Sequence, residues 1–182
     1  MKSAVFKIFN MNLDHFINHL SNNKTVVTGL VRGISDEQAH WRPSPTAWSV
    51  LEVTRHLYDE EREDFRARVQ LTLNDPAKAW PAIEPGKWVI DRKYNERNPK
   101  QVLEHWLRER DESLKWLSGL KSPVIHWNNA HIHPSGISLS AADLLVAWLA
   151  HDYLHIRQLN ELHYLYLKHT TAPANIGYAG DW

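Results

Sequence analysis

The chain of 182 residues contains no cysteine. This absence excludes disulfides, thiolate metal ligands and a cysteine nucleophile, so a bound metal would have to be held by nitrogen and oxygen atoms. Long apolar runs that could span a bilayer are also missing, and residues 1–9 lack the apolar core and the small-residue cleavage site of a signal peptide. We therefore expect a cytoplasmic protein that does not associate with membranes.

The chain also lacks an excess of charge of either sign. It has 21 basic and 21 acidic side chains, so its formal net charge is zero. No global field attracts nucleic acid, and the sequence has no basic run, zinc finger or recognition-helix pattern. We expect no nucleic-acid partner. Two residue types are abundant instead: nine tryptophans and twelve histidines, both of which could line a site.

The length fits one domain that spans residues 1–182, and we find no internal repeat or low-complexity tract. Apolar residues recur at helical spacing in four segments. These segments, each with a capping residue at or near its start, are about residues 10–31, 50–73, 98–120 and 141–168. A Ser35–Gln38 capping box adds a brief helix that ends near His40. The pattern predicts an all-α fold.

The connection between the second and third of these helices is long. Residues 76–98 are rich in proline, tryptophan and charge, and a tight antiparallel turn needs only a few residues. We interpret this segment as a crossover along the end or side of the molecule, which would join two helices that run parallel. The predicted architecture is a four-helix bundle with a long crossover between helices 2 and 3.

Three histidines fall on the predicted interior faces. His151 and His155 lie four residues apart on the fourth helix, within one apolar stripe, so both can offer a nitrogen to one ion. His56 shares the buried quadrant of the second helix with Val53 and Leu57. Three imidazoles from two helices would leave coordination positions open for water or substrate, as in a catalytic metal site.

The same histidine spacing has plainer explanations. A histidine on an apolar face is commonly a core residue that bonds to its neighbours, and a chain with twelve histidines contains some pairs at this spacing by chance. The zinc-protease motif is excluded because Asp152 stands where that motif needs glutamate. We interpret Asp152 as a packing residue or as a residue that orients an imidazole through its second nitrogen.

Further candidates surround the histidines in the sequence. Four aromatic side chains are candidate walls of a substrate pocket, with core packing as the plainer alternative: Trp48, Tyr58, Trp148 and Tyr153. Glu60, one turn after His56, is a candidate general base or additional ligand. Alternatively, Glu60 belongs with Asp59 and Glu61 to a solvated acidic face.

Two stretches, WSVLEVTRHL at residues 48–57 and AHDYLHIRQL at 150–159, make the chain resemble the DinB-like superfamily. Shorter similarities are WPAI at 80–83, YNE at 94–96, Arg110, and HPSG at 133–136, and the likeness extends from residue 41 to 159. The resemblance implies an up-down-down-up bundle, one nickel or zinc ion on His56, His151 and His155, and frequently a homodimer. We expect Asp152 and Gln158, within the second motif, to support the metal ligands.

The resemblance implies thiol-dependent or hydrolytic chemistry, and a role without catalysis is a third alternative. The leading hypothesis is a thiol-dependent S-transferase or isomerase, in which the ion lowers the pKa of a low-molecular-weight thiol that attacks a small electrophilic substrate. The lack of cysteine is consistent with a borrowed thiol. The second hypothesis is hydrolysis of a small amide or ester by metal-activated water, which would proceed without thiol. The third is a structural metal in a module that binds a small ligand or dimerises.

Overall fold

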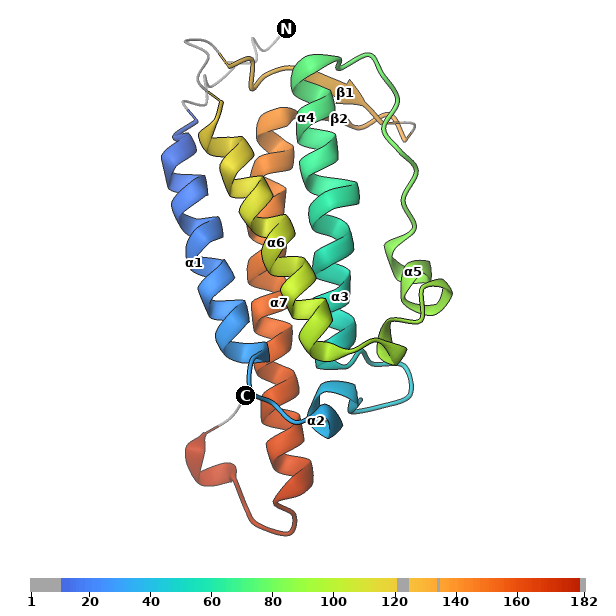
Figure 1. The fold of residues 1–182 in the computed structure, drawn as a ribbon, viewed down its shortest axis with the longest axis vertical. Helices are drawn as coiled ribbons and strands as arrows, with labels where there is room; N and C mark the ends of the chain where they lie inside the picture. Colours follow the sequence, from blue (N-terminus) through green and yellow to red (C-terminus); the bar gives the residue numbers. More distant parts are fainter. Residues whose placement is uncertain (1–10, 121–124, 134, 181–182) are drawn as a thin grey trace, which may run out of the picture.

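The computed structural model describes residues 11–120, 125–133 and 135–180, which form a bundle of four long helical rods (Figure 1). The rods are α1 (Leu13–Val31), the continuous run of α3 (Val50–Asp59), η1 (Glu60–Phe65) and α4 (Arg66–Asn74), then α6 (Pro99–Ser118) and α7 (Ala141–Thr170). These bounds lie within a few residues of the predicted ones, while the predicted start at Asn10 lies outside the described residues. The four-helix bundle is confirmed.

The rods run in the order that the resemblance implies. In Figure 1, α1 and α7 run downward, whereas the α3–α4 rod and α6 run upward. The crossover descends along the side of the bundle and contains α5 (Pro85–Asp91) and the 3-10 turn η2 (Tyr94–Glu96). It thus joins two parallel rods, as its length predicted, and α1 packs against both α6 and α7.

Side-chain caps fix where the rods begin. Ser49 accepts a hydrogen bond from the Glu52 amide at 3.2 Å, and the Glu52 carboxylate accepts from the Ser49 amide at 2.8 Å. Ser140 and Asp143 form the same reciprocal box at the start of α7. The short helix α2 (Asp36–His40) has only half of its predicted box, because the Gln38 side chain bonds to His163 instead.

A short β-hairpin is among the elements that were not predicted. Within the stretch that was expected to be irregular, β1 (Ala130–Ile132) pairs antiparallel with β2 (Ser138–Ser140). Gly136 has a positive φ of 84°, a conformation that glycine adopts without the steric cost of a side chain. The hairpin lies at the top of the bundle in Figure 1, and the 3-10 turn η3 (Gly177–Ala179) follows α7. The all-α description therefore holds for the bundle with a small hairpin added.

The second rod contains a π-helical turn, η1. At about 100° per residue, the eight-residue step from Leu57 to Phe65 overshoots two full turns by about 80°, and the wider π turn absorbs this extra residue. Three consecutive acidic residues at this turn are 4% exposed or less: Asp59, Glu60 and Glu61. The alternative of a solvated acidic face was therefore wrong.

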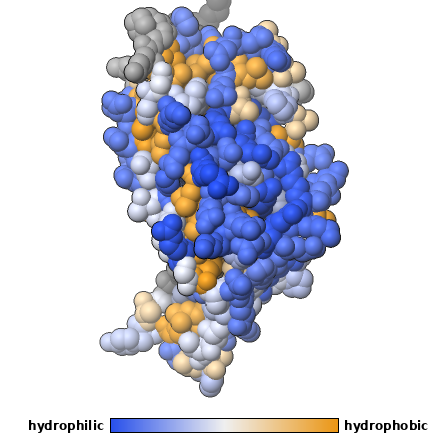
Figure 2. Space-filling view, viewed as in Figure 1, coloured by the Kyte–Doolittle hydropathy of each residue, from blue (hydrophilic) through white to orange (hydrophobic). Residues whose placement is uncertain are grey.

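The core consists of two apolar clusters. One includes Val53, Leu57 and Leu159, and the other includes Trp148 and Leu149. In the sequence, His56 lies between Val53 and Leu57 of the first cluster, and His151 comes two residues after Leu149 of the second cluster. In the part of the chain described, no helix is both long and apolar enough to cross a membrane. Hydrophilic residues cover most of the face that α6 and the crossover present in Figure 2.

Candidate metal centre

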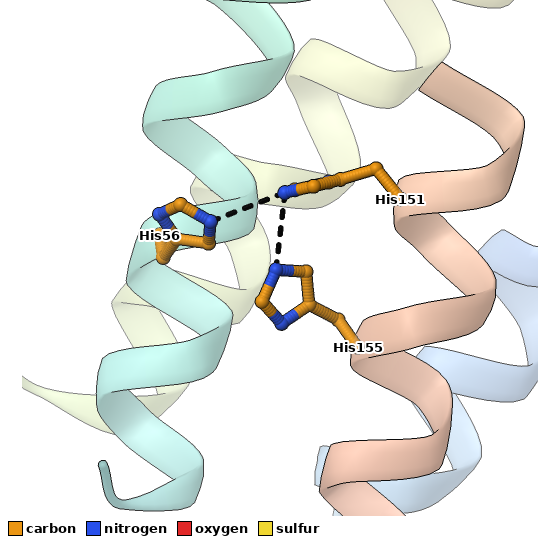
Figure 3. Close-up of side chains that lie close together, drawn as sticks. All are labelled: His56, His151 and His155. Carbon is orange, nitrogen blue, oxygen red and sulfur yellow. Dashed lines mark hydrogen bonds between the residues drawn. The ribbon is translucent and has the colours of Figure 1, made fainter. Parts of the chain in front are cut away.

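Three imidazoles meet inside the bundle, one from α3 and two from α7 (Figure 3). Nε2 of His151 lies 3.2 Å from Nε2 of His56 and 3.0 Å from Nε2 of His155. All three candidate ligand atoms lie within 4.8 Å of one another. Two nitrogens bound to one tetrahedral ion at 2.0–2.1 Å are about 3.3 Å apart, so this cluster has nearly the spacing that a single metal ion requires.

Hydrogen bonding determines which nitrogen of His155 faces the centre. Its Nδ1 atom donates to Oε1 of Gln158 at 2.8 Å, so its Nε2 atom carries the lone pair when the ring is neutral. Nδ1 of His56 is buried and has no hydrogen-bond partner among the described residues. The lone pair on Nε2 of His155 faces the ring nitrogens of His56 and His151 at close range, and a shared cation satisfies it best. The residues present therefore fit a metal ion.

Burial keeps the cluster uncharged. Burial, together with the smaller effects of the adjacent His155 and His151 rings, lowers the pKa of His56 to about 2. Burial and His155 lower the pKa of His151 to about 3, and burial also lowers the pKa of His155. Neutral imidazole is the form that binds metals, so the metal-free cluster is in its binding form at neutral pH.

A cavity of about 440 Å³ adjoins one side of the cluster. The Trp48 ring lies parallel to that of His155, with an interplanar angle of 4° and centroids 6.4 Å apart. Trp48 also contacts the His56 ring, with centroids at 4.9 Å. The cavity is lined by Pro43, Thr46, Ala47, Trp48, His155, Gln158, Glu161, Leu162 and Leu165. A small molecule bound there would lie directly beside a candidate metal ligand.

The other three predicted pocket aromatics lie elsewhere. Tyr58 faces α6, where its ring contacts that of His105. Tyr153 is 46% exposed, and its hydroxyl bonds to Nδ1 of His19 at 2.8 Å. Trp148 is 1% exposed and belongs to the second core cluster. None of the three lines the cavity beside His155.

Glu60 lies on η1 and is 4% exposed. Its carboxylate is not among the ligand atoms that lie within 4.8 Å of one another in the histidine cluster. Burial and the nearby Asp64 carboxylate raise the pKa of Glu60 to about 8, and its Oε1 atom has no partner in the described chain. Glu60 is therefore a buried carboxyl with a raised pKa that lies outside the group of three imidazoles.

Asp152 supports the site through other residues. Its carboxylate accepts hydrogen bonds from Arg110 at 2.7 and 2.8 Å and from Asn23 at 3.2 Å, whereas no bond to an imidazole is found among the described residues. Of the two roles considered for Asp152, these contacts fit packing, and Gln158 has the contact that orients an imidazole. Phe65, whose ring centroid lies 4.9 Å from that of His151, was not predicted as a neighbour of the site.

These features define a helical-bundle protein with a buried three-histidine centre and an adjoining cavity. The sequence matches the DinB superfamily over residues 19–159. The chain therefore belongs to the DinB superfamily, as the two histidine-containing motifs indicated.

Among solved structures, the chain is similar to YfiT from Bacillus subtilis, described as a probable metal-dependent hydrolase with an unusual four-helix bundle topology. The two share 18% sequence identity, and the alignment covers 90% of this chain and 91% of that chain with a TM-score of 0.73. At this identity the likeness establishes the fold. Among curated proteins, none matches this chain.

Proposed function

We propose that this protein is a metal-dependent enzyme that hydrolyses a small amide or ester at His56, His151 and His155. The convergence of three neutral Nε2 atoms beside a cavity carries this proposal. The likeness to YfiT, a probable metal-dependent hydrolase, supports hydrolysis over the thiol transfer that the sequence favoured. A zinc or nickel ion bound there would supply a Lewis acid that lowers the pKa of a water molecule.

The chain's own groups would bind and orient the substrate. Trp48 offers a flat apolar wall beside His155, and Gln158 holds that imidazole in place. Glu60 is the proposed proton carrier, because a carboxyl with a pKa of about 8 can both accept and release a proton near neutral pH. The pH–rate profile of Glu60→Gln tests this role, and we expect it to lose the change in rate near pH 8 that titration of Glu60 causes.

The test of hydrolysis uses protein purified without a nickel column and loaded with zinc or nickel. We expect turnover of some member of a panel of small amides and esters without added thiol. His56→Ala should lower kcat/KM at least about 100-fold, because it removes one of three ligands. His105→Ala is the matched control, since His105 is a half-buried imidazole of α6 that contacts Tyr58. Equal activity of His56→Ala and the control would contradict the proposal.

Thiol-dependent transfer is the second candidate. A chain with no cysteine must obtain a sulfur nucleophile from a cosubstrate. Isothermal titration of the metal-loaded protein with bacillithiol, mycothiol and glutathione tests this candidate, and absence of binding to all three would exclude it. In the third candidate, a structural metal, His56→Ala would lower the melting temperature while the intact protein altered no substrate in the screen.

We also propose that the protein forms a homodimer through the outer face of α7. Three large side chains at helical spacing on this face are 43–54% exposed: Val146, Tyr153 and Leu154. Apolar side chains grouped on one surface commonly mark an interface. Light scattering should show a dimer for the native chain and a monomer for Leu154→Glu. Leu167→Glu, at a leucine 52% exposed nearer the end of α7, is the control that should leave the dimer intact.

A further inference from the structure

A fully buried arginine lies at the centre of the bundle. Arg110 of α6 is 0% exposed, and hydrogen-bond partners occupy all its donor positions. Its Nε and Nη2 atoms each donate to the Glu61 carboxylate at 2.8 Å. Nη1 and Nη2 donate to Asp152 at 2.7 and 2.8 Å, and Nη1 also donates to the Leu20 carbonyl at 3.1 Å. The guanidinium is thus held on both of its edges.

Two neutral donors complete this cluster, which we call the Arg110 network. The Asn23 side chain donates to Asp152 at 3.2 Å, and the Trp148 indole donates to Glu61 at 3.2 Å. The network connects all four rods. Burial disfavours the charge of Arg110, but Asp152 and Glu61 outweigh burial and raise the pKa of Arg110 above its ordinary value. Two carboxylates face one guanidinium, so the formal charge of the network is −1.

The network is attached to the metal centre through its two carboxylates. Asp152 directly follows His151 in α7, so anchoring its side chain fixes the backbone from which the imidazole projects. Glu61 stands five residues after His56, in the π turn that brings it into the interior. Phe65 connects the metal centre with the Arg110 network, since its ring contacts both His151 and Trp148, with centroids at 4.9 and 6.0 Å.

We propose that the Arg110 network positions the metal centre and strengthens its affinity for a divalent cation. Glu61, Arg110 and Asp152 are positioning residues, because they act on the imidazoles through the helices and through their excess negative charge. The three ligands are neutral, so binding an ion places two uncompensated positive charges in the interior, and a buried carboxylate nearby offsets part of that cost. The inference rests on the proposed metal centre.

A purely structural clamp would make a different prediction. If the network only joined the rods, its carboxylates would matter for the stability of the metal-free fold and not for metal affinity. The two roles separate when the charge is removed and the shape is kept. Asp152→Asn and Glu61→Gln are such variants, and either one brings the charge of the network from −1 to zero. Because each carboxylate lies on a different rod, one variant can be measured even where the other folds poorly.

The experiment measures zinc affinity by competition with a chromophoric chelator, and unfolding by urea in the presence of EDTA. We expect each variant to raise the zinc dissociation constant about tenfold, equivalent to about 1.4 kcal/mol. The visible spectrum of the cobalt-loaded protein should change as well, because it reports the geometry of the ligands. A clamp without a positioning role would leave this spectrum unaltered.

Asp59→Asn is the matched control. Asp59 is a buried carboxylate, 0% exposed, on the same rod as Glu61, but it bonds to Tyr94 and pairs with Arg92 on the side of the crossover. We expect this control to lose stability and keep the native zinc affinity. Native affinity in both network variants would overturn the positioning role while leaving the metal centre intact. Failure of the unaltered protein to bind zinc would overturn the metal centre and, with it, this inference.

Discussion

Gln158 acts on the metal centre through a single hydrogen bond, in which it accepts from Nδ1 of His155 at 2.8 Å. Loss of a partner that orients a metal-binding imidazole typically weakens metal affinity 10- to 100-fold. We expect Gln158→Ala to raise the zinc dissociation constant about tenfold, measured by chelator competition. Asn160→Ala is the control, because that exposed amide donates to the Ile156 carbonyl of its own helix. Equal affinities of the two variants would refute the orienting role.

Glu60 makes stability depend on alkaline pH. Its pKa is about 8 in the folded protein, because of burial and Asp64, against 4.5 as the ordinary value. Between these values the folded protein holds a proton that the unfolded chain has released, so stability is full below about pH 4.5 and decreases as the pH rises toward 8. We expect Glu60→Gln to flatten this decrease in urea unfolding between about pH 5 and about pH 9.

The control for this prediction is Glu63→Gln. Hydrogen bonding to Arg92 lowers the pKa of Glu63. The contribution of Glu63 to the free energy of unfolding therefore changes only at pH values below its ordinary pKa, outside the alkaline range. The Glu63→Gln protein should therefore keep the pH dependence of the unaltered chain. A Glu60→Gln curve that runs parallel to that of Glu63→Gln would count against a raised pKa of Glu60.

Helical phase explains which single residues the sequence could predict. His56, His151 and His155 share interior faces with apolar residues, so spacing predicted that they point inward, and the family resemblance implied that they bind one ion. Tyr58 and Tyr153 each lie two residues after a histidine, which rotates them by about 200° around the helix and away from the cluster. Trp148 shares the face of His151 but lies one turn away, where it packs in the core. Proximity in sequence was a poor guide to the cavity.

The π turn is the element that sequence reasoning could not find. The apolar positions before it and after it are out of phase by one residue, but an acidic run covers the join, and this run looks like a surface segment. Glu61 was therefore not expected in the interior. Arg110 gave a clearer signal, because it lies at helical spacing from Leu103, Trp106 and Leu117 in the apolar stripe of α6. A charge on such a stripe indicates a buried partner of opposite sign.

The two capping boxes differ in burial, and this difference predicts how much stability each contributes. Ser49 is 0% exposed and also donates a hydrogen bond to Asn95 at 2.7 Å, whereas the Ser140 hydroxyl donates to Asp143 within an exposed box. Replacing such a cap by alanine costs about 0.5–2 kcal/mol. We expect about 2 kcal/mol for Ser49→Ala and about 1 kcal/mol for Ser140→Ala, measured by urea unfolding. Equal losses would contradict the role of the Asn95 contact.

At the scale of the whole molecule, the length of one connection determined the topology. Residues 76–98 are too many for a tight turn, so the chain returns along the bundle and the second and third rods run parallel. As a result, α3 and α7, far apart in sequence, contribute imidazoles to one centre. The hairpin of β1 and β2 was beyond prediction, because three-residue strands carry almost no periodic signal.

The buried histidines should make the metal-free protein sensitive to acid. The pKa of His56 is lowered to about 2 and that of His151 to about 3, from an ordinary value of 6.5. The unfolded chain therefore binds protons near pH 6.5 that the folded protein does not accept until far lower pH. Unfolding takes up these protons, so stability is full above about pH 6.5 and decreases as the pH falls toward the folded values.

This dependence is measurable by urea unfolding in EDTA between about pH 7 and about pH 5. Each histidine with a strongly lowered pKa should contribute a slope that approaches about 1.4 kcal/mol per pH unit on the acid side. His56→Gln should lower the slope by the contribution of one such group, and the double variant with His151→Gln by two. Because EDTA removes metal, the effect belongs to the protein alone. Identical slopes in all three proteins would show that the imidazoles are not buried as neutral groups, and the proposed centre would lose its physical basis.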